Sequence, residues 1–101
     1  MGLYELALED VTSAITLHPK NAEFFWIKGI IYTMAAGPDA NRALLDEAVG
    51  AFSTAINMSP NQAKYRASRA KVLRQLDRLV EALADLESAI AMTPDVRTWL
   101  S

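Results

Sequence analysis

The stretch Ala48-Val-Gly-Ala-Phe-Ser-Thr-Ala-Ile-Asn-Met-Ser-Pro60 occurs in three related copies along this chain of 101 residues. The other two copies run from Ala7 to Pro19 and from Ala82 to Pro94. Each copy begins with alanine, carries an Ala-Ile pair at the same point and ends in proline. Repetition of this kind indicates an architecture in which every unit is completed by its neighbours.

Apolar residues recur within each copy at the spacing of an α-helix. In the first copy they stand at intervals of three and four residues, on Leu3, Ala7, Val11, Ala14 and Ile15. Proline then ends each helix because it lacks a backbone N–H. The same pattern predicts helices over 3–17, 22–36, 40–58, 63–76 and 79–92, and the first turns of another over 96–101. Asn21 and Asp39 are the expected N-caps of the second and third helices.

The second predicted helix is apolar on almost every side, which is typical of a helix packed against several neighbours. Gly29 lies inside it, where glycine costs about 1 kcal/mol relative to alanine. We therefore expect a neighbouring helix to approach Gly29 closely.

The intervals between the copies are unequal. The three prolines are 41 and 34 residues apart, so one unit has seven extra residues. We expect these between Tyr32 and Ala48, most simply at 37–43. The same two offsets align Phe24, Tyr65 and Trp99, one aromatic residue in each successive unit.

A unit of 34 residues with these small and large positions resembles the tetratricopeptide repeat family. The small and proline positions of its pattern are matched by Gly29, Ala48, Ala55 and Pro60 and then by Ala70, Ala82, Ala89 and Pro94. Arg66 departs from the pattern, since the family usually has a large apolar residue there. The resemblance implies an all-α fold of helix-turn-helix repeats stacked as a right-handed α-solenoid, with about five helices plus a short C-terminal helical turn.

The resemblance also divides the chain. It implies a single domain over 1–101, in which 3–19 is the second helix of a partial repeat. A full repeat with the seven-residue insertion covers 22–60, a second full repeat covers 63–94, and 96–101 begins a further helix. The unfinished pattern at both ends leads us to expect a piece of a longer protein.

In the resembling family, the first helix of each unit lines a concave groove. The matching positions here that we select as partner-binding residues are Trp26, Ile30, Thr33, Lys64, Lys71 and Arg74, and their neighbours on the same faces are Glu23, Ile27, Met34, Ala67, Ser68 and Gln75. An apolar wall opposite a basic wall suits a peptide or helix with acidic residues beside apolar ones. The alternative is that Trp26 and Ile30 are covered by a preceding unit and that the three cations form a solvated helix face.

The sequence gives little support for catalysis or for other ligands. The chain has no cysteine, a single histidine (His18, expected at the surface) and a net charge of −2. Asp85 and Glu87 are expected on an exposed helix face rather than as a converging acid pair. We therefore expect no enzyme activity, no cofactor, no metal site, no small-molecule substrate, and no nucleic-acid or membrane partner.

The function that the resemblance implies is a protein–protein interaction scaffold. Two alternatives stay open, namely self-association (a homodimer) through the uncapped terminal helices and a regulatory appendage of a larger enzyme. No signal peptide or transmembrane segment is visible in the sequence, which favours a cytoplasmic location without establishing it.

Overall fold

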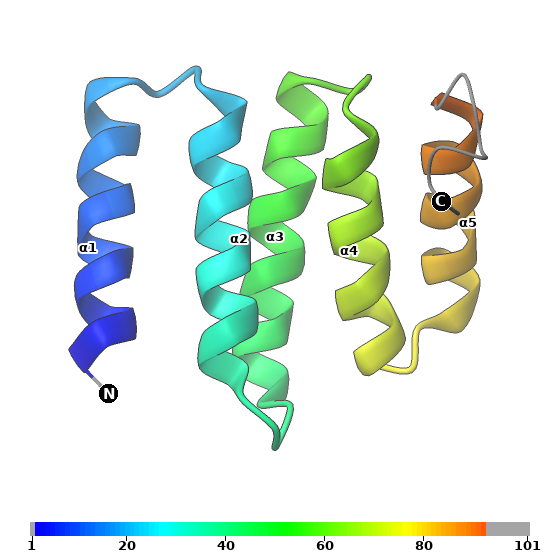
Figure 1. The fold of residues 1–101 in the computed structure, drawn as a ribbon, viewed down its shortest axis with the longest axis horizontal. Helices are drawn as coiled ribbons and strands as arrows, with labels where there is room; N and C mark the ends of the chain where they lie inside the picture. The colour runs from blue at the N-terminus through cyan, green and yellow to red at the C-terminus, as the bar shows by residue number, and fades with distance from the viewer. Residues whose placement is uncertain (1, 93–101) are drawn as a thin grey trace, which may run out of the picture.

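Five α-helices make up the part of the chain that the structure, a computed structural model, describes, which is residues 2–92. They are α1 (Gly2–Leu17), α2 (Ala22–Ala36), α3 (Arg42–Met58), α4 (Ala63–Gln75) and α5 (Leu79–Met92). The helices stand side by side and successive helices run in opposite directions (Figure 1). The predicted all-α fold is confirmed, whereas the expected helical turn at 96–101, with Trp99, lies outside the described residues.

The helices pack mainly as hairpins. α2 packs against α3, and α4 packs against α5, while α3 and α4 join the two hairpins and α1 packs against α2. Each hairpin therefore corresponds to one predicted helix-turn-helix unit. Because α3 contacts both α2 and α4, it lies at the centre of the stack.

The ends of the helices follow from local chemistry. Asn21 caps α2 as predicted, and its side chain accepts a hydrogen bond of 3.0 Å from the backbone N–H of Glu23. The predicted start of α3 at Ala40 with Asp39 as cap is wrong. Ala40 has a φ of 52°, which no right-handed helix accepts, so Asn41 caps the helix instead and accepts from Leu44 N–H.

The seven extra residues are spread over the whole α2–α3 turn. α2 has 15 residues and α4 has 13, while α3 has 17 and α5 has 14. The turn 37–41 is also two residues longer than the turn 76–78. The prediction placed the extra residues in the turn and at the start of the next helix; the structure adds the end of α2.

The largest buried side chain is Phe52 of α3, which lies against Gly29 of α2. A Cβ atom on Gly29 would stand only 2.5 Å from Cε1 of Phe52, far inside contact distance. Around this contact lies a buried apolar cluster of Ala36, Leu45, Ala48, Phe52, Val72 and Leu76. The expected close approach at Gly29 is thus confirmed, and its neighbour is an aromatic ring.

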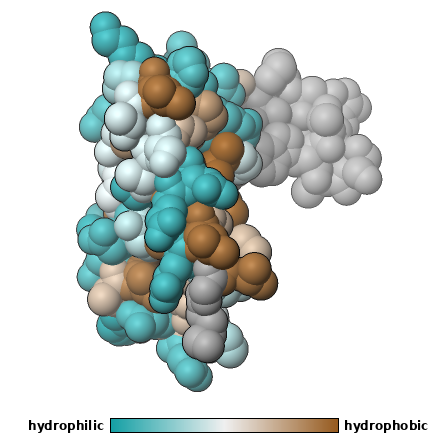
Figure 2. All heavy atoms as spheres, turned by 90° about the vertical axis from the view of Figure 1, so that its left-hand side faces the viewer, coloured by the Kyte–Doolittle hydropathy of each residue, from teal (hydrophilic) through white to brown (hydrophobic). Residues whose placement is uncertain are grey.

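α1 forms one side of the stack, and its outward face is mixed in character. Figure 2 looks onto this side and shows apolar side chains in patches between hydrophilic ones. Leu3 and Leu6 are exposed, as expected for an uncovered helix. The expectation that Val11 shares this open side is wrong, because α1 packs against α2 and Val11 is buried.

Two glycines in helix interiors give a matched pair of substitutions. Gly29→Ala should lower the free energy of unfolding by about 1–3 kcal/mol, because the new methyl group is forced against the buried ring of Phe52. Gly50→Ala should instead raise it by about 0.5–1 kcal/mol, because nothing lies within 4 Å of its Cβ position and alanine favours helix. Urea unfolding measures both, and equal effects of the two variants would refute the close contact.

Candidate functional site

The predicted partner-binding residues lie on two neighbouring first helices, α2 and α4. We call this surface the α2–α4 face and define it by Glu23, Trp26, Ile30 and Thr33 of α2 with Lys64, Ser68, Lys71 and Arg74 of α4. The spacing within each helix puts its residues along one side. Direct side-chain contacts join the two helices across this face.

A cluster of four side chains holds one end of the face together. Glu23 accepts hydrogen bonds of 2.9 Å from both the Lys64 ammonium and the Tyr65 hydroxyl. The Lys64 nitrogen also stands 4.5 Å from the ring centroid of Trp26, in cation–π contact. Because Glu23 and Trp26 belong to α2 whereas Lys64 and Tyr65 belong to α4, the cluster fixes the spacing of the two units.

Trp26 and Ile30 form an apolar wall that is partly buried. The Trp26 indole N–H donates to Ser68 Oγ at 2.9 Å, and both side chains pack against the buried cluster around Phe52. The contacts that cover Trp26 therefore come from α3 and α4 as well as from any preceding unit. Thr33 is less available than predicted, since its hydroxyl donates to the Gly29 carbonyl oxygen at 2.8 Å.

The cations of the face differ in their surroundings. Lys64 is engaged by Glu23, whereas Lys71 and Arg74 are exposed and make no hydrogen bond or ion pair with any of residues 2–92. Both of these latter side chains project from α4 beyond the Glu23 cluster along the helix. An acidic group that approached the face would find its uncompensated positive charge there.

The contacts within the cluster change two ionisation equilibria. The hydrogen bond from Lys64 lowers the pKa of the Glu23 carboxyl, against the opposing effect of desolvation. Burial and the Glu23 carboxylate together raise the pKa of the Tyr65 hydroxyl to about 12. Glu23 is therefore charged and Tyr65 neutral across the physiological range, which keeps both hydrogen bonds intact.

A second polar cluster joins α3, α4 and α5 away from this face. Arg69 donates two hydrogen bonds, of 2.6 and 2.7 Å, to the carboxylate of Asp85 and one of 3.0 Å to Ser53. The expectation that Asp85 is exposed is wrong: it is buried because the Arg69 guanidinium compensates its charge. Arg78 is likewise paired, with Glu81. The basic residues of α4 and its following turn are thus partly neutralised within the fold.

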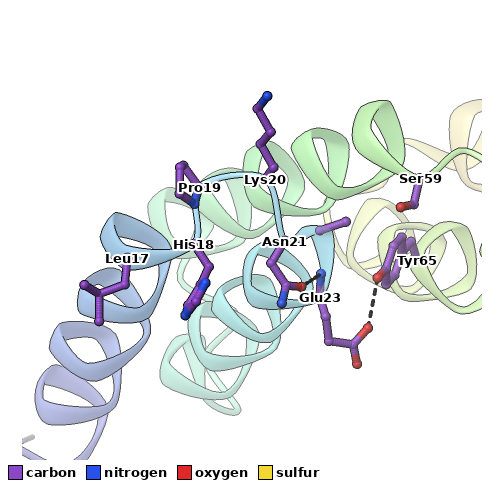
Figure 3. A pocket seen from close by; sticks show the side chains of 9 residues that line it. Leu17, His18, Pro19, Lys20, Asn21, Glu23, Ser59 and Tyr65 are labelled. Carbon is purple, nitrogen blue, oxygen red and sulfur yellow. Dashed lines mark hydrogen bonds between the residues drawn. The ribbon is translucent and has the colours of Figure 1, made fainter.

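An open pocket of about 680 Å³ lies at the turn between α1 and α2 (Figure 3). Its lining includes His18, Lys20 and Asn21 of the turn, Ser59 after α3, and the hydrogen-bonded pair of Glu23 and Tyr65. His18 is at the surface, as expected. The polar groups of Asn21, Glu23 and Tyr65 are already used to cap α2 and to join α2 to α4. This pocket borders the α2–α4 face through Glu23.

Residues 2–92 contain no cluster of three or more histidine or acidic side chains that could hold a metal ion. None of the described helices is long and apolar enough to cross a bilayer.

Sequence reasoning missed the two charged contacts between units. Glu23 and Lys64 are separated by 41 residues, which is the offset between the two units, so they occupy the same position on successive first helices. Opposite charges at equivalent positions were the available signal. Arg69 and Asp85 had no such signal, since only the packing of α4 on α5 brings them together.

Comparison with known proteins follows from this geometry. No family model matches the sequence. The human protein named Tetratricopeptide repeat protein 13 is 29% identical over 98 residues, which cover 97% of this chain and 11% of that protein. This chain thus corresponds to about a tenth of the human relative's length.

The solved structure of MamA MSR-1 C2 has the same arrangement of helices. The TM-score is 0.73 at 24% sequence identity, over 88% of this chain and 47% of that chain. At this identity the similarity supports the fold. Its agreement with the helix pairs described above accounts for nearly all of the described residues.

The Glu23–Tyr65 contact predicts a specific loss of stability in alkali. An unfolded tyrosine ionises near pH 10, whereas the pKa of folded Tyr65 is about 12. The contribution of Tyr65 is therefore complete below about pH 10 and is lost as the pH rises through about 12. Between these values, the free energy of unfolding should fall less in Tyr65→Phe than in the wild type.

Glu23→Gln should also reduce this alkaline fall, because it removes the carboxylate that keeps the phenol protonated. The pKa of Tyr32 is raised as well, by burial and by Glu47, and contributes equally in all three proteins. Urea unfolding at a series of pH values measures the fall. The same fall in Tyr65→Phe and wild type would contradict the described contact.

Proposed function

Because this chain belongs to the tetratricopeptide repeat family, whose domains generally act as protein–protein interaction modules, we propose that it holds a peptide or helix of a partner protein on the α2–α4 face. The observation that carries the proposal is the contrast between Lys64, which Glu23 engages, and the unpaired Lys71 and Arg74. The binding segment is then one with acidic side chains for these two cations and apolar side chains for the Trp26 wall.

The surroundings of the face favour binding with little rearrangement. The Glu23 cluster and the Trp26–Ser68 hydrogen bond fix α2 relative to α4 before any partner arrives. A surface that is already ordered loses less conformational entropy when it binds. Trp26 acts in this proposal mainly as a rigid wall, and Lys71 and Arg74 supply the contacts that the partner adds.

Self-association is a second candidate, and the exposed apolar side chains of both terminal helices favour it. Leu3 and Leu6 of α1, and Leu79, Leu83 and Ile90 of α5, are exposed in the described structure. Light scattering over a concentration series distinguishes the candidates. A mass twice the 11.1 kDa of one chain, reduced to one chain by Leu6→Glu or Leu83→Glu, would support a dimer.

Selection from a library of displayed 12-residue random peptides tests the first candidate. We expect enrichment of peptides with aspartate or glutamate beside leucine or phenylalanine. Lys71→Ala combined with Arg74→Ala should weaken the Kd of an enriched peptide by about tenfold or more, because two charge-assisted contacts are lost. The Kd should also rise with salt concentration.

Lys28→Ala is the matched control, since it removes a cation of α2 that lines a different pocket, between α2 and α3. This variant should leave the Kd unchanged. Enriched peptides that bind the Lys71 and Arg74 double variant as tightly as the wild type would refute the proposed face.

A further inference from the structure

The outer face of α5 differs sharply from the same face of α3, although the two helices occupy equivalent places in their units. A 34-residue offset aligns them. The small residues that face the first helix of the same unit are buried in both, as with Ala48 at 0% and Ala82 at 5% exposure. The hairpin contacts of the two units are therefore alike.

The large residues on the other side are buried in α3 alone. Leu45 is 0% exposed and its equivalent Leu79 is 60% exposed. Phe52 and Ile56 are 1% and 5% exposed, whereas their equivalents Leu86 and Ile90 are 42% and 49% exposed. On α3 these residues are covered because α4, the first helix of the next unit, packs there. Of the described helices, only α4 packs on α5.

The contact that α4 makes with α3 specifies what fits on α5. Tyr65 of α4 packs in a buried cluster with Ala55 and Ile56 of α3. The same 34-residue offset converts Ile56 into Ile90 and Tyr65 into Trp99. The connection is equivalent too, since Ser59-Pro60-Asn61 leads into α4 and Thr93-Pro94-Asp95 follows α5.

We propose that residues 96–101 form the first turns of a helix that docks on the apolar face of α5, with Trp99 on Ile90 as Tyr65 lies on Ile56. This segment lies outside the described residues, and its sequence has the required pattern, with Val96, Trp99 and Leu100 at helical spacing. An aromatic side chain at this point buries apolar area against a surface that water otherwise covers.

The length of the segment limits what it covers. Six helical residues span about 9 Å, whereas the stripe from Leu79 to Ile90 spans about 16 Å. A helix that runs antiparallel to α5 starts at the Ile90 end. Leu86 and Ile90 are then covered, and the half of the stripe with Leu79 and Leu83 stays exposed. Self-association through α5 would therefore involve the Leu79 half.

Tryptophan fluorescence of the full chain tests this docking. Trp26→Phe leaves Trp99 as the single tryptophan, since the chain has two. We expect emission shifted to the blue, and quenching by acrylamide reduced, relative to the same protein unfolded in urea. Adding Ile90→Ser should shift the emission back to the red while circular dichroism still reports the helices. Leu79→Ser is the matched control at the far end of the stripe and should change nothing.

Three results would overturn the proposal. The first is a Trp99 emission and quenching equal to those of the unfolded protein. The second is an equal red shift from Leu79→Ser and Ile90→Ser, since this would contradict the register. The third is a protected Trp99 whose protection disappears on dilution as the mass falls to one chain, because a second copy would then be the occupant.

Hydrogen exchange in the protein with Trp26 intact gives a second test, in case Trp26→Phe impairs folding. Trp99→Ala should accelerate exchange in the last turn of α5, over 86–92, whereas Thr98→Ala should not. Equal exchange in the Trp99→Ala variant and the wild type would count against docking.

Discussion

The approach of Gly29 to the ring of Phe52 is the constraint on which the stack depends. Because Gly29 has no side chain, α2 can lie close enough to α3 for the ring to be almost fully enclosed. α3 then presents its opposite side, with Ile56, to Tyr65 of α4. A single small residue thus determines whether the central helix can be packed on two sides at once.

The same geometry explains why the α2–α4 face is selective in its charges. Packing of α2 and α4 on α3 brings equivalent positions of two units side by side, and at one of them Glu23 meets Lys64. The resulting ion pair is exposed and contributes little to stability by itself. Its larger effect is to remove Lys64 from the set of unpaired cations, so that the positive charge of the face is concentrated at Lys71 and Arg74.

The helices could be predicted from the sequence because each is encoded locally, by apolar spacing, prolines and caps such as Asn21. The errors have non-local or fine backbone causes. Ala40 looked suitable for a helix, but the turn needs a positive φ there. Asp85 looked exposed, but Arg69, 16 residues earlier on a different helix, compensates its charge. The binding face was predicted as a set of positions, whereas its internal pairing required the structure.

The seven extra residues have a structural consequence at the opposite end of the hairpins. They lengthen α2 and α3 as well as their turn, so this hairpin extends beyond the turn of its neighbour (Figure 1). Arg42, the first residue of α3, lies at this extension, and its guanidinium donates to the Leu76 carbonyl oxygen at 3.4 Å and to Asp77 at 3.5 Å. Both acceptors belong to the α4–α5 turn, where the left-handed φ of Asp77 ends the helix. The extension therefore contacts the neighbouring unit, and because these hydrogen bonds are long and exposed, they guide the register of the two turns more than they stabilise the fold.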